Sequence, residues 1–254
     1  MKILKKICRV LLIAAFWICV WAFAAWRFGK PLLFPSPLTV LQTLVSMLQT
    51  PQFYMITATS LGNILLGILI ALMGACTLAI LTFAIPFLKE LIAPIMAVIK
   101  ATPVASFIIL ALIFIGSAKV PTFITVLIVF PIVWTNLDEG LCKIDPQLKE
   151  VARVYQMSPL RRLRVLYLPS VKPYFLSACK SSLGLAWKAG VAAEIIAMPP
   201  DTIGTMIGEA KLYIMTAEMF AWTLTVVLLS LAIEYLFSAI FRQLESKNNR
   251  KEAT

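Results

Sequence analysis

The segment Asp145–Pro169, DPQLKEVARVYQMSPLRRLRVLYLP, is the longest charged stretch between apolar blocks of membrane-spanning length. Its pattern predicts two short helices. Asp145 followed by Pro146 supplies the first helix with a capping side chain and a proline at its first position. Ser158 followed by Pro159 repeats this signal, and the second helix is expected to end at the closing proline. The segment is therefore expected to be folded rather than a loose connection.

Apolar residues recur at helical spacing in the first of these helices, which indicates a face that docks onto another surface. They are Leu148, Val151, Ala152 and Tyr155. Basic residues surround this face, at Lys143, Lys149, Arg153, Arg161, Arg162, Arg164 and Lys172. The alternative is a solvated basic loop that only sets the orientation of the chain in a membrane.

The composition is that of an integral membrane protein. Of the 254 residues, 61% are apolar and 14% are charged, and the mean hydropathy is +0.92. The net charge of +11 lies at the ends of apolar stretches and in one loop. This distribution indicates membrane orientation, with no nucleic-acid partner. Five Cys residues without metal-type spacing and the lack of any His argue against a disulfide framework or a metal site.

Apolar stretches long enough to cross a bilayer predict six transmembrane helices. They cover residues 10–26, 56–85, 91–115, 120–141, 171–196 and 219–241. The first could instead be a secretory signal peptide ending near Ala24, but its length and aromatic end favour a membrane helix. Placing both termini in the cytoplasm puts most Lys and Arg residues on that side, as the positive-inside rule requires.

These stretches divide the chain into four parts. Residues 1–30 form an N-terminal transmembrane helix with a basic start, and residues 31–53 form an external segment with a short interfacial helix from 38 to 48. Residues 54–242 form a five-helix core that includes the cytoplasmic loop 142–170. Residues 243–254 form a polar tail, expected to be frayed. Within the core, residues 198–216 are expected to be an outer loop with re-entrant character.

Small residues recur every four positions on two of the predicted helices, which favours close helix packing. One set is Gly67, Ala71, Ala75 and Ala79, and the other is Ala178, Ser182, Ala186 and Gly190. The role expected of these faces is structural, although small residues are also simply frequent in membrane helices.

Glu150, Ala152 and the closing Leu166-x-Leu168-Pro169 stand at the offsets of a loop motif in permease subunits of ABC importers. That motif runs Glu-Ala-Ala, then a glycine, then Ile-x-Leu-Pro. The chain resembles this family. The resemblance implies an all-α integral membrane fold of the type I importer class. Its six transmembrane helices would have a cytoplasmic coupling helix between the fourth and fifth.

Two residues depart from the motif. Val151 replaces its second residue, and Gln156 stands where the glycine is expected. Glutamine adopts a positive φ at a higher cost than glycine, so the turn after the first helix is expected to be built differently here.

The resemblance also implies roles for residues in this loop. Glu150 would orient or anchor the coupling helix, the arginines would contact an ATPase or anionic lipid, and Pro169 would fix the entry into the fifth span. The residues implied in ATPase coupling are Glu150, Val151, Ala152, Tyr155, Gln156, Ser158, Arg161, Arg162, Leu168 and Pro169.

Polar residues inside the predicted spans are candidates for a translocation pathway, because a charge in the membrane is costly and usually faces protein or water. The candidates are Lys100, Thr102, Pro103, Ser106, Lys188 and Glu194. Lys100 precedes the Thr102-Pro103 break in a span that Pro94 also interrupts. It could instead snorkel or cap the half-helix. Six residues separate Lys188 from Glu194, so each needs a partner elsewhere. The alternative for these two is a structural ion pair.

The stretch Pro35-Ser36-Pro37 and the stretch GLAWKAGVAAE at 184–194 resemble permeases of the nitrate, sulfonate and taurine uptake group. The resemblance implies a homodimer that works with two ATPase subunits and a solute-binding protein, in contact with membrane lipid in a bacterial inner membrane. No GxxxxGK[ST] phosphate loop occurs, so ATP and Mg²⁺ are expected on the ATPase, with no cofactor and no catalysis on this chain.

Other functions remain open from sequence. The substrate could be a small anion such as nitrate, a sulfonate or taurine, or a thiamine-precursor pyrimidine. An ion-coupled secondary transporter would use the intramembrane charges as a relay, but it gives no reason for the spaced Glu-to-Pro loop. A structural membrane subunit would explain the small-residue faces, but not charges beside a proline break.

Overall fold

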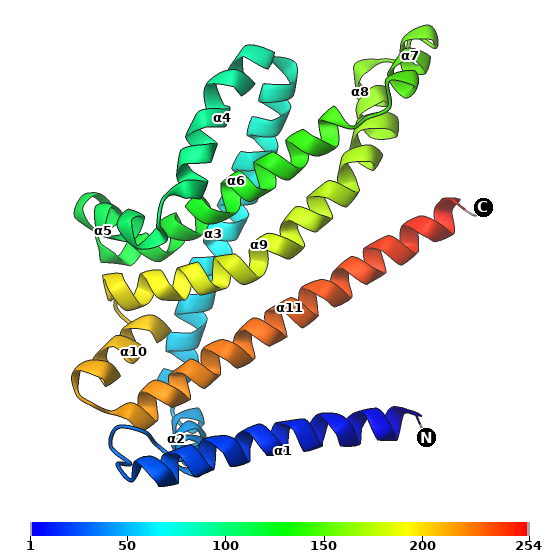
Figure 1. Cartoon of the computed structure of the whole chain (residues 1–254). Helices are drawn as coiled ribbons and strands as arrows, with labels where there is room; N and C mark the ends of the chain where they lie inside the picture. The colour runs from blue at the N-terminus through cyan, green and yellow to red at the C-terminus, as the bar shows by residue number, and fades with distance from the viewer. Residues whose placement is uncertain (1, 253–254) are drawn as a thin grey trace.

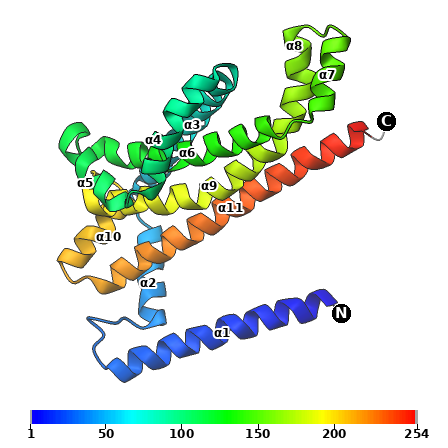
Figure 2. The same ribbon diagram turned by 45° about the horizontal axis from the view of Figure 1, so that its top comes forward.

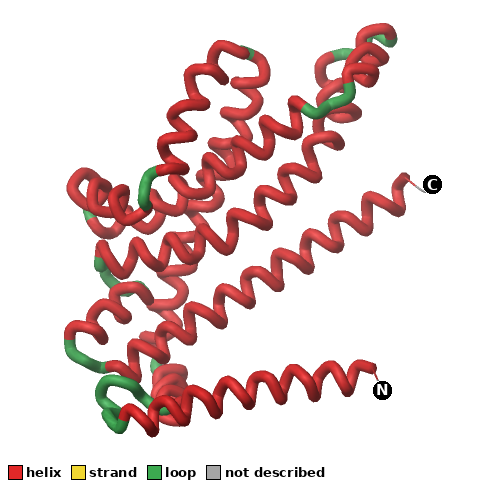
Figure 3. The backbone as a smooth tube through the Cα atoms, viewed as in Figure 1, coloured by secondary structure: helices red, strands yellow, loops and turns green. Residues whose placement is uncertain are grey.

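The protein is helical throughout the part that the structure describes. The computed structural model describes the backbone of residues 2–252 and the side chains of residues 8–9 and 11–239, and no strand occurs among them (Figure 3). In chain order, the elements are α1 (Lys2–Phe28), α2 (Pro37–Leu48), α3 (Pro51–Ala84), α4 (Pro86–Ala101), α5 (Val104–Ile115), the 3₁₀ turn η1 (Ser117–Lys119), α6 (Val120–Cys142), α7 (Pro146–Val154), α8 (Pro159–Arg162), the π-helical turn η2 (Leu163–Tyr167), α9 (Leu168–Ala197), α10 (Ile203–Leu212) and α11 (Thr216–Glu252).

The long helices run between two ends of the molecule (Figures 1 and 2). The start of α1, the end of α11 and the α7–α8 segment lie toward one end, and α5 and α10 lie toward the other. Helix α6 packs extensively against both α3 and α9, so these three helices form the centre of the fold. Helix α2 packs mainly on α11, with Val40 and Leu44 buried.

The small-residue face of α3 is buried, as the four-residue spacing predicts. Gly67, Ala71, Ala75 and Ala79 all point into the interior. A Cβ added at Gly67 would lie 2.7 Å from the carbonyl oxygen of Thr122 on α6, so only a glycine permits this approach. The second set, on α9, is buried in the same way. Close backbone contact therefore holds α3 and α9 onto α6.

Four helical stretches among the described residues are apolar and long enough to cross a bilayer. They are Leu11–Phe28, Pro51–Ala84, Ser117–Cys142 and Thr216–Ala239. The pair α4 and α5 adds a fifth candidate if it is counted as one broken span, with a bend of 104°. Helix α9 has 30 residues but contains Lys172, Lys180, Lys188 and Glu194, and does not reach the same apolarity.

The break in the predicted third span occurs at one proline and not at the other. The chain bends by 104° between Ala101 and Val104, as the Thr102-Pro103 pair predicts. The expectation of an interruption at Pro94 is wrong, because α4 continues through it. The residue before Pro103 has extended backbone, with φ −80° and ψ 134°, which ends α4 there.

The second helix of the 145–169 segment does not end at Pro169, contrary to the prediction. Helix α8 continues through η2 into α9 without a break, so Pro169 lies inside one helical rod. At the end of the π turn, the amide of Leu168 donates to the carbonyl of Leu163, five residues earlier. A wider turn of this kind relieves the clash between a proline ring and the preceding turn of helix.

Two segments expected to be irregular are helical. The region 198–216 contains α10, which packs on α9 and α11. The tail expected to fray from residue 243 continues as α11 to Glu252, and residues 253–254 lie outside the described part. The first is packed between two long helices, and the second continues a long helix that begins at Thr216.

Candidate functional site

Helix α7 is a short helix closed at both ends by local hydrogen bonds. The Oδ1 atom of Asp145 accepts from the amide of Gln147 at 2.8 Å, as expected for the N-cap. At the other end, the amide of Gln156 donates to the carbonyl of Arg153, and that of Met157 donates to the carbonyl of Ala152. These two bonds form the closure that usually has a glycine at the left-handed position.

Gln156 occupies that left-handed position, with a φ of 46°. The expectation that its side chain would force a different turn is therefore wrong. A non-glycine residue in this region costs about 1–2 kcal/mol. The two closing hydrogen bonds, together with the burial of Ala152, offset this cost.

Helix α7 exposes most of its apolar side chains to solvent. Ala152 is 3% exposed and joins the central core together with Leu166. Val154 and Tyr155 are each 73% exposed, and Leu148 and Val151 are about half exposed. One small residue is thus the buried anchor of the helix, while its large apolar residues remain half to three-quarters exposed. Such a surface on a folded segment makes this face a candidate interaction site.

The predicted charged residues of this segment surround the exposed face. Glu150, Arg161 and Arg164 are exposed, and Arg162 is half-buried with its Nε atom unpaired. Ser158 stands at the N-cap of α8 without a side-chain hydrogen bond, and Leu168 and Pro169 lie exposed at the start of α9. The amine of Lys149 lies 6.0 Å from the centre of the Phe83 ring on α3.

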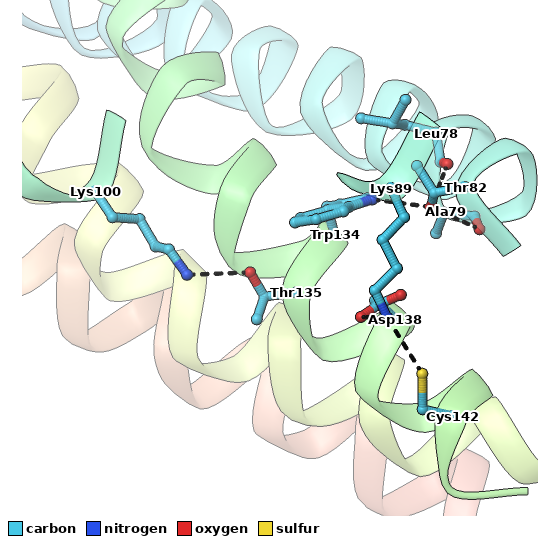
Figure 4. A network of polar contacts seen from close by, with 9 residues as sticks. All are labelled: Leu78, Ala79, Thr82, Lys89, Lys100, Trp134, Thr135, Asp138 and Cys142. Atoms are coloured by element: carbon cyan, nitrogen blue, oxygen red, sulfur yellow. Dashed lines mark hydrogen bonds and ion pairs between the residues drawn. The ribbon is translucent and has the colours of Figure 1, made fainter. Parts of the chain in front are cut away.

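A polar network ties α4 to the end of α6, directly before this segment (Figure 4). The Lys89 amine contacts Oδ2 of Asp138 at 2.9 Å and Sγ of Cys142 at 3.4 Å. On the same side, Nε1 of Trp134 donates to Oγ1 of Thr82 on α3 at 3.2 Å. Local sequence pattern does not predict this network, although Lys89 and Asp138 are rare charges at the ends of apolar stretches.

The next turn of the chain has a second ion pair. The Lys143 amine pairs with Oε1 of Glu139, and this hydrogen bond raises the pKa of the exposed Lys143 ammonium above its ordinary value. The amine also lies 5.8 Å from the centre of the Tyr174 ring on α9. These two ion pairs, from Lys89 and Lys143, are the ones recorded among the described side chains. Both lie at the end of the molecule that carries α7 and α8.

The candidate pathway residues fall into separate environments. Lys100 is exposed and donates to Oγ1 of Thr135 on α6 at 3.2 Å (Figure 4). Thr102 bonds the carbonyl of Val98, and Pro103 and Ser106 lie exposed at the bend. The bend therefore brings four of the predicted residues together, and Lys188 and Glu194 lie on α9.

Lys188 faces away from the buried side of α9, as helical geometry predicts from its distance to Gly190. It lines a cavity of about 280 Å³ between α9 and α11. Lys180 and Glu234 line the same cavity, so charges of both signs face this space.

Glu194 is fully buried and holds the start of α10 in place. Its Oε2 atom accepts from Oγ of Ser60 at 2.9 Å and from the amide of Gly204 at 3.1 Å. Ser60 Oγ in turn accepts from the amide of Ile203 at 2.8 Å. A Cβ at Gly204 would lie 2.2 Å from that of Glu194, so glycine is required for this approach. Glu194 thus serves a helix N-terminus, where a carboxylate is favoured.

The pairing of Glu194 with Ser60 was not predicted from the sequence, although Ser60 carries a signal. Ser60 lies seven residues before Gly67, two helical turns along, on the same face of α3 as the small residues. A hydroxyl on a buried apolar face requires a hydrogen-bonding partner. The partner itself comes from a segment 134 residues away, which local pattern cannot supply.

A family model described as "Binding-protein-dependent transport system inner membrane component" matches residues 63–250, more than half of the chain. The match includes α7, α8 and the six predicted pathway residues.

Relatives share a low but extended similarity. The chain is 24% identical to the taurine transport system permease protein TauC of Escherichia coli, over 88% of this chain and 83% of that protein. It is 28% identical to the bicarbonate transport system permease protein CmpB of Synechocystis, over 61% of this chain and 55% of that protein. It is also 28% identical to the nitrate import permease protein NrtB of Leptolyngbya laminosa, over 55% of this chain and 50% of that protein.

A solved structure shares the fold. The crystal structure of an amino acid ABC transporter with histidines has a chain that superposes with a TM-score of 0.63, at 16% identity. The superposition covers 80% of this chain and 98% of that one. The helical architecture, the apolar spans and the matched family model lead to one conclusion: this chain belongs to the family of binding-protein-dependent transport system inner membrane components.

Proposed function

We propose that this chain is the membrane-spanning permease subunit of an ATP-driven importer for a small anion, and that α7 and α8 form its docking surface for an ATPase subunit. The observation that carries the proposal is the exposed apolar face of α7. Val154 and Tyr155 are 73% exposed on a helix closed at both ends, beside a basic segment. ATP and Mg²⁺ bind the ATPase, and this chain has no catalytic role.

The proposed mechanism is alternating access driven through α7 and α8. ATP-driven closure of two ATPases moves the docked segment. Because α8, η2 and α9 form one rod, this movement acts directly on α9 and on the α6 surface beneath it. Glu150 and the exposed Arg161 and Arg164 contact the ATPase around the apolar centre, a common arrangement of protein interfaces.

The topology proposed for this mechanism has six crossings with both termini in the cytoplasm. The start of α1, the end of α11 and the α7–α8 segment lie toward one end of the molecule (Figures 1 and 2), and this end is rich in Lys and Arg. In this topology, the bent α4–α5 pair and the charged α9 each cross once. A second copy of the chain completes the pore, and a solute-binding protein delivers substrate at the end with α5 and α10.

The substrate class proposed is a small anion. Relatives of this chain are named for taurine, bicarbonate and nitrate transport. Lys100 at the α4–α5 bend is the cation proposed to face the pathway, because it lies beside extended backbone inside a predicted span.

A secondary transporter has less support, since Lys100, Lys188 and Glu194 occupy separate environments and form no relay with one another.

The test compares two tyrosines of nearly equal exposure. Tyr155 on α7 is 73% exposed, and Tyr213 after α10 is 74% exposed. We expect an ATPase to co-purify with the detergent-solubilised wild-type protein. Tyr155→Asp should abolish this, and Tyr213→Asp should retain it. Unaltered thermal unfolding of both variants would show that the fold is intact. Retention of the ATPase by Tyr155→Asp and by a deletion of residues 146–163 would overturn the proposed docking site.

A further inference from the structure

A second and larger cavity lies beside the α7–α8 segment, apart from the proposed docking face. Its volume is about 500 Å³. Its walls come from the second half of α3, the end of α6 and the beginning of α9 with its π turn. A volume of this size falls within the range of pockets that bind organic ligands.

The lining of this cavity is almost entirely hydrocarbon. Ile80, Leu141 and Phe175 represent its three walls, and Lys172 is the charged residue among the lining side chains. Sugars, nucleotides and small anions require several polar contacts, which this lining does not provide. The chemistry of the cavity therefore fits a long apolar chain with one anionic group at its edge.

Lys172 is placed to meet that anionic group. It is half-buried on the first turns of α9, and no ion pair to it is recorded among the described residues. The recorded pairs use Lys89 and Lys143 instead, at the same end of the molecule. Arg164, eight residues earlier on the same rod, is exposed and adds positive charge to this end. A half-buried cation without a carboxylate partner favours an anionic ligand.

The proposed topology puts the cavity at the cytoplasmic membrane boundary, where anionic lipids are found. It opens near the end of α3 and the start of α9, the end where the basic residues of the chain gather. The positive-inside rule places this end at the cytoplasmic face. Anionic lipids are concentrated in that leaflet, and basic pockets between membrane helices bind their head groups.

We propose that this cavity holds an acyl chain of an anionic phospholipid of the cytoplasmic leaflet, whose phosphate binds the Lys172 ammonium. The lipid contacts Tyr167, whose ring packs edge-on against Phe83 at 5.4 Å between centres. Lys149 of α7 lies over the same Phe83 ring. The bound lipid thus supports the base of the α7–α8 segment from the membrane side. This proposal rests on the topology proposed above, and it does not depend on the identity of the substrate or on ATPase docking.

The test is native mass spectrometry of the delipidated, detergent-purified protein with phosphatidylglycerol or phosphatidylcholine of equal chain length. We expect phosphatidylglycerol to bind more tightly. Lys172→Gln should weaken phosphatidylglycerol binding roughly fivefold, because one lysine near an anionic lipid surface contributes about 1 kcal/mol of binding free energy. The affinity for phosphatidylcholine should not change. The matched control is Lys180→Gln, an exposed lysine on α9 outside this cavity, which should leave both affinities unchanged.

A second variant tests the apolar part of the cavity. Ile80 is 63% exposed at the cavity wall, so Ile80→Trp should occupy the space without disturbing the core. It should weaken the binding of both lipids while thermal unfolding stays the same. Equal affinity for the two lipids, or equal effects of Lys172→Gln and Lys180→Gln, would overturn the proposal.

Two other occupants would give distinct results, and either would overturn the proposal. If free phosphate is the ligand, millimolar inorganic phosphate would displace phosphatidylglycerol and Ile80→Trp would have no effect. If a second copy of the chain covers the cavity, Ile80→Cys would form disulfide-linked dimers and no lipid would bind. Failure of either kind leaves the Tyr155→Asp test of ATPase docking unaffected, because that test measures a different surface.

Discussion

The two ends of α9 differ in how deeply the side chains around them are buried. At the α10 end, Oε2 of Glu194, Ser60 and two amides of α10 form buried hydrogen bonds that join three helices, while Oε1 of Glu194 is buried without a partner. At the α7–α8 end, Ala152 alone anchors α7, and Val154 and Tyr155 face outward. One end buries its side chains within this chain, and the other exposes apolar side chains that a partner would cover.

This difference separates residues that form the fold from residues that remain available for function. A buried carboxylate is costly unless its bonds are made, so Glu194 is tied to structure. Exposed valine and tyrosine contribute little to folding, so their presence on α7 requires another explanation. The predictions below test this contrast through stability, in order of decreasing effect.

The largest loss is expected for Glu194→Ala. Removal of the carboxylate leaves the Ser60 hydroxyl and the Gly204 amide buried without an acceptor, at about 1–3 kcal/mol each. Thermal unfolding in detergent should show a strongly lowered midpoint. Glu194→Gln retains an acceptor oxygen and should keep most of the stability. An unchanged midpoint for Glu194→Ala would remove the contrast between the two ends.

A smaller loss is expected for Gly67→Ala. The added methyl group would lie 2.7 Å from Thr122 on α6, and overpacking of this kind costs about 1–3 kcal/mol. The control is Gly62→Ala on the same helix, where the methyl group would meet nothing within 4 Å. The two midpoints should differ, with only Gly67→Ala lowered. Equal midpoints would mean that α3 and α6 separate easily.

A gain is expected for Gln156→Gly, at the exposed end. Glycine adopts the φ of 46° without steric cost, so α7 should be stabilised by about 0.5–1 kcal/mol. Hydrogen exchange of the α7 amides should become slower. Gln49 caps α2 with a φ of −81°, so Gln49→Gly should give no gain there. Faster exchange in α7 after Gln156→Gly would contradict the assigned turn.

The smallest effect is expected for Val154→Ser. This side chain is 73% exposed, so the midpoint of unfolding should change by no more than about 0.5 kcal/mol. Val129→Ser on α6 is the buried counterpart, with a side chain that is 0% exposed, and should be strongly destabilising. A large loss for Val154→Ser would show that α7 packs on this chain after all.

Local signals predicted the parts of the fold that depend on neighbouring residues. Asp145 caps α7 as its sequence indicates, and the small residues of α3 and α9 are buried as their spacing indicates. The break at Thr102-Pro103 followed from the restriction that proline places on the residue before it. In each case the cause lies within one or two helical turns of the residue.

The missed features depend on distant or compensating contacts. Ser60 meets Glu194 only because α3 and α9 both pack on α6. Gln156 tolerates its positive φ because the Met157 amide bonds back to Ala152, which is buried. Pro94 stays within α4, and Pro169 within the α8–α9 rod. A single sequence records which residues are costly, but not which contacts offset the cost.

The π turn at Leu163–Tyr167 sets the rotational phase between α8 and α9. Such a turn contains one residue more than an α-helical turn, and each residue of an α-helix advances the side chains by about 100°. If the same residues were wound as plain α-helix, α7 and α8 would be rotated about the α9 axis by about that angle. The exposed face of α7 would then point elsewhere while every helix remained intact. The direction in which this face points is thus set by how one turn of helix is wound, independently of which side chains the face carries.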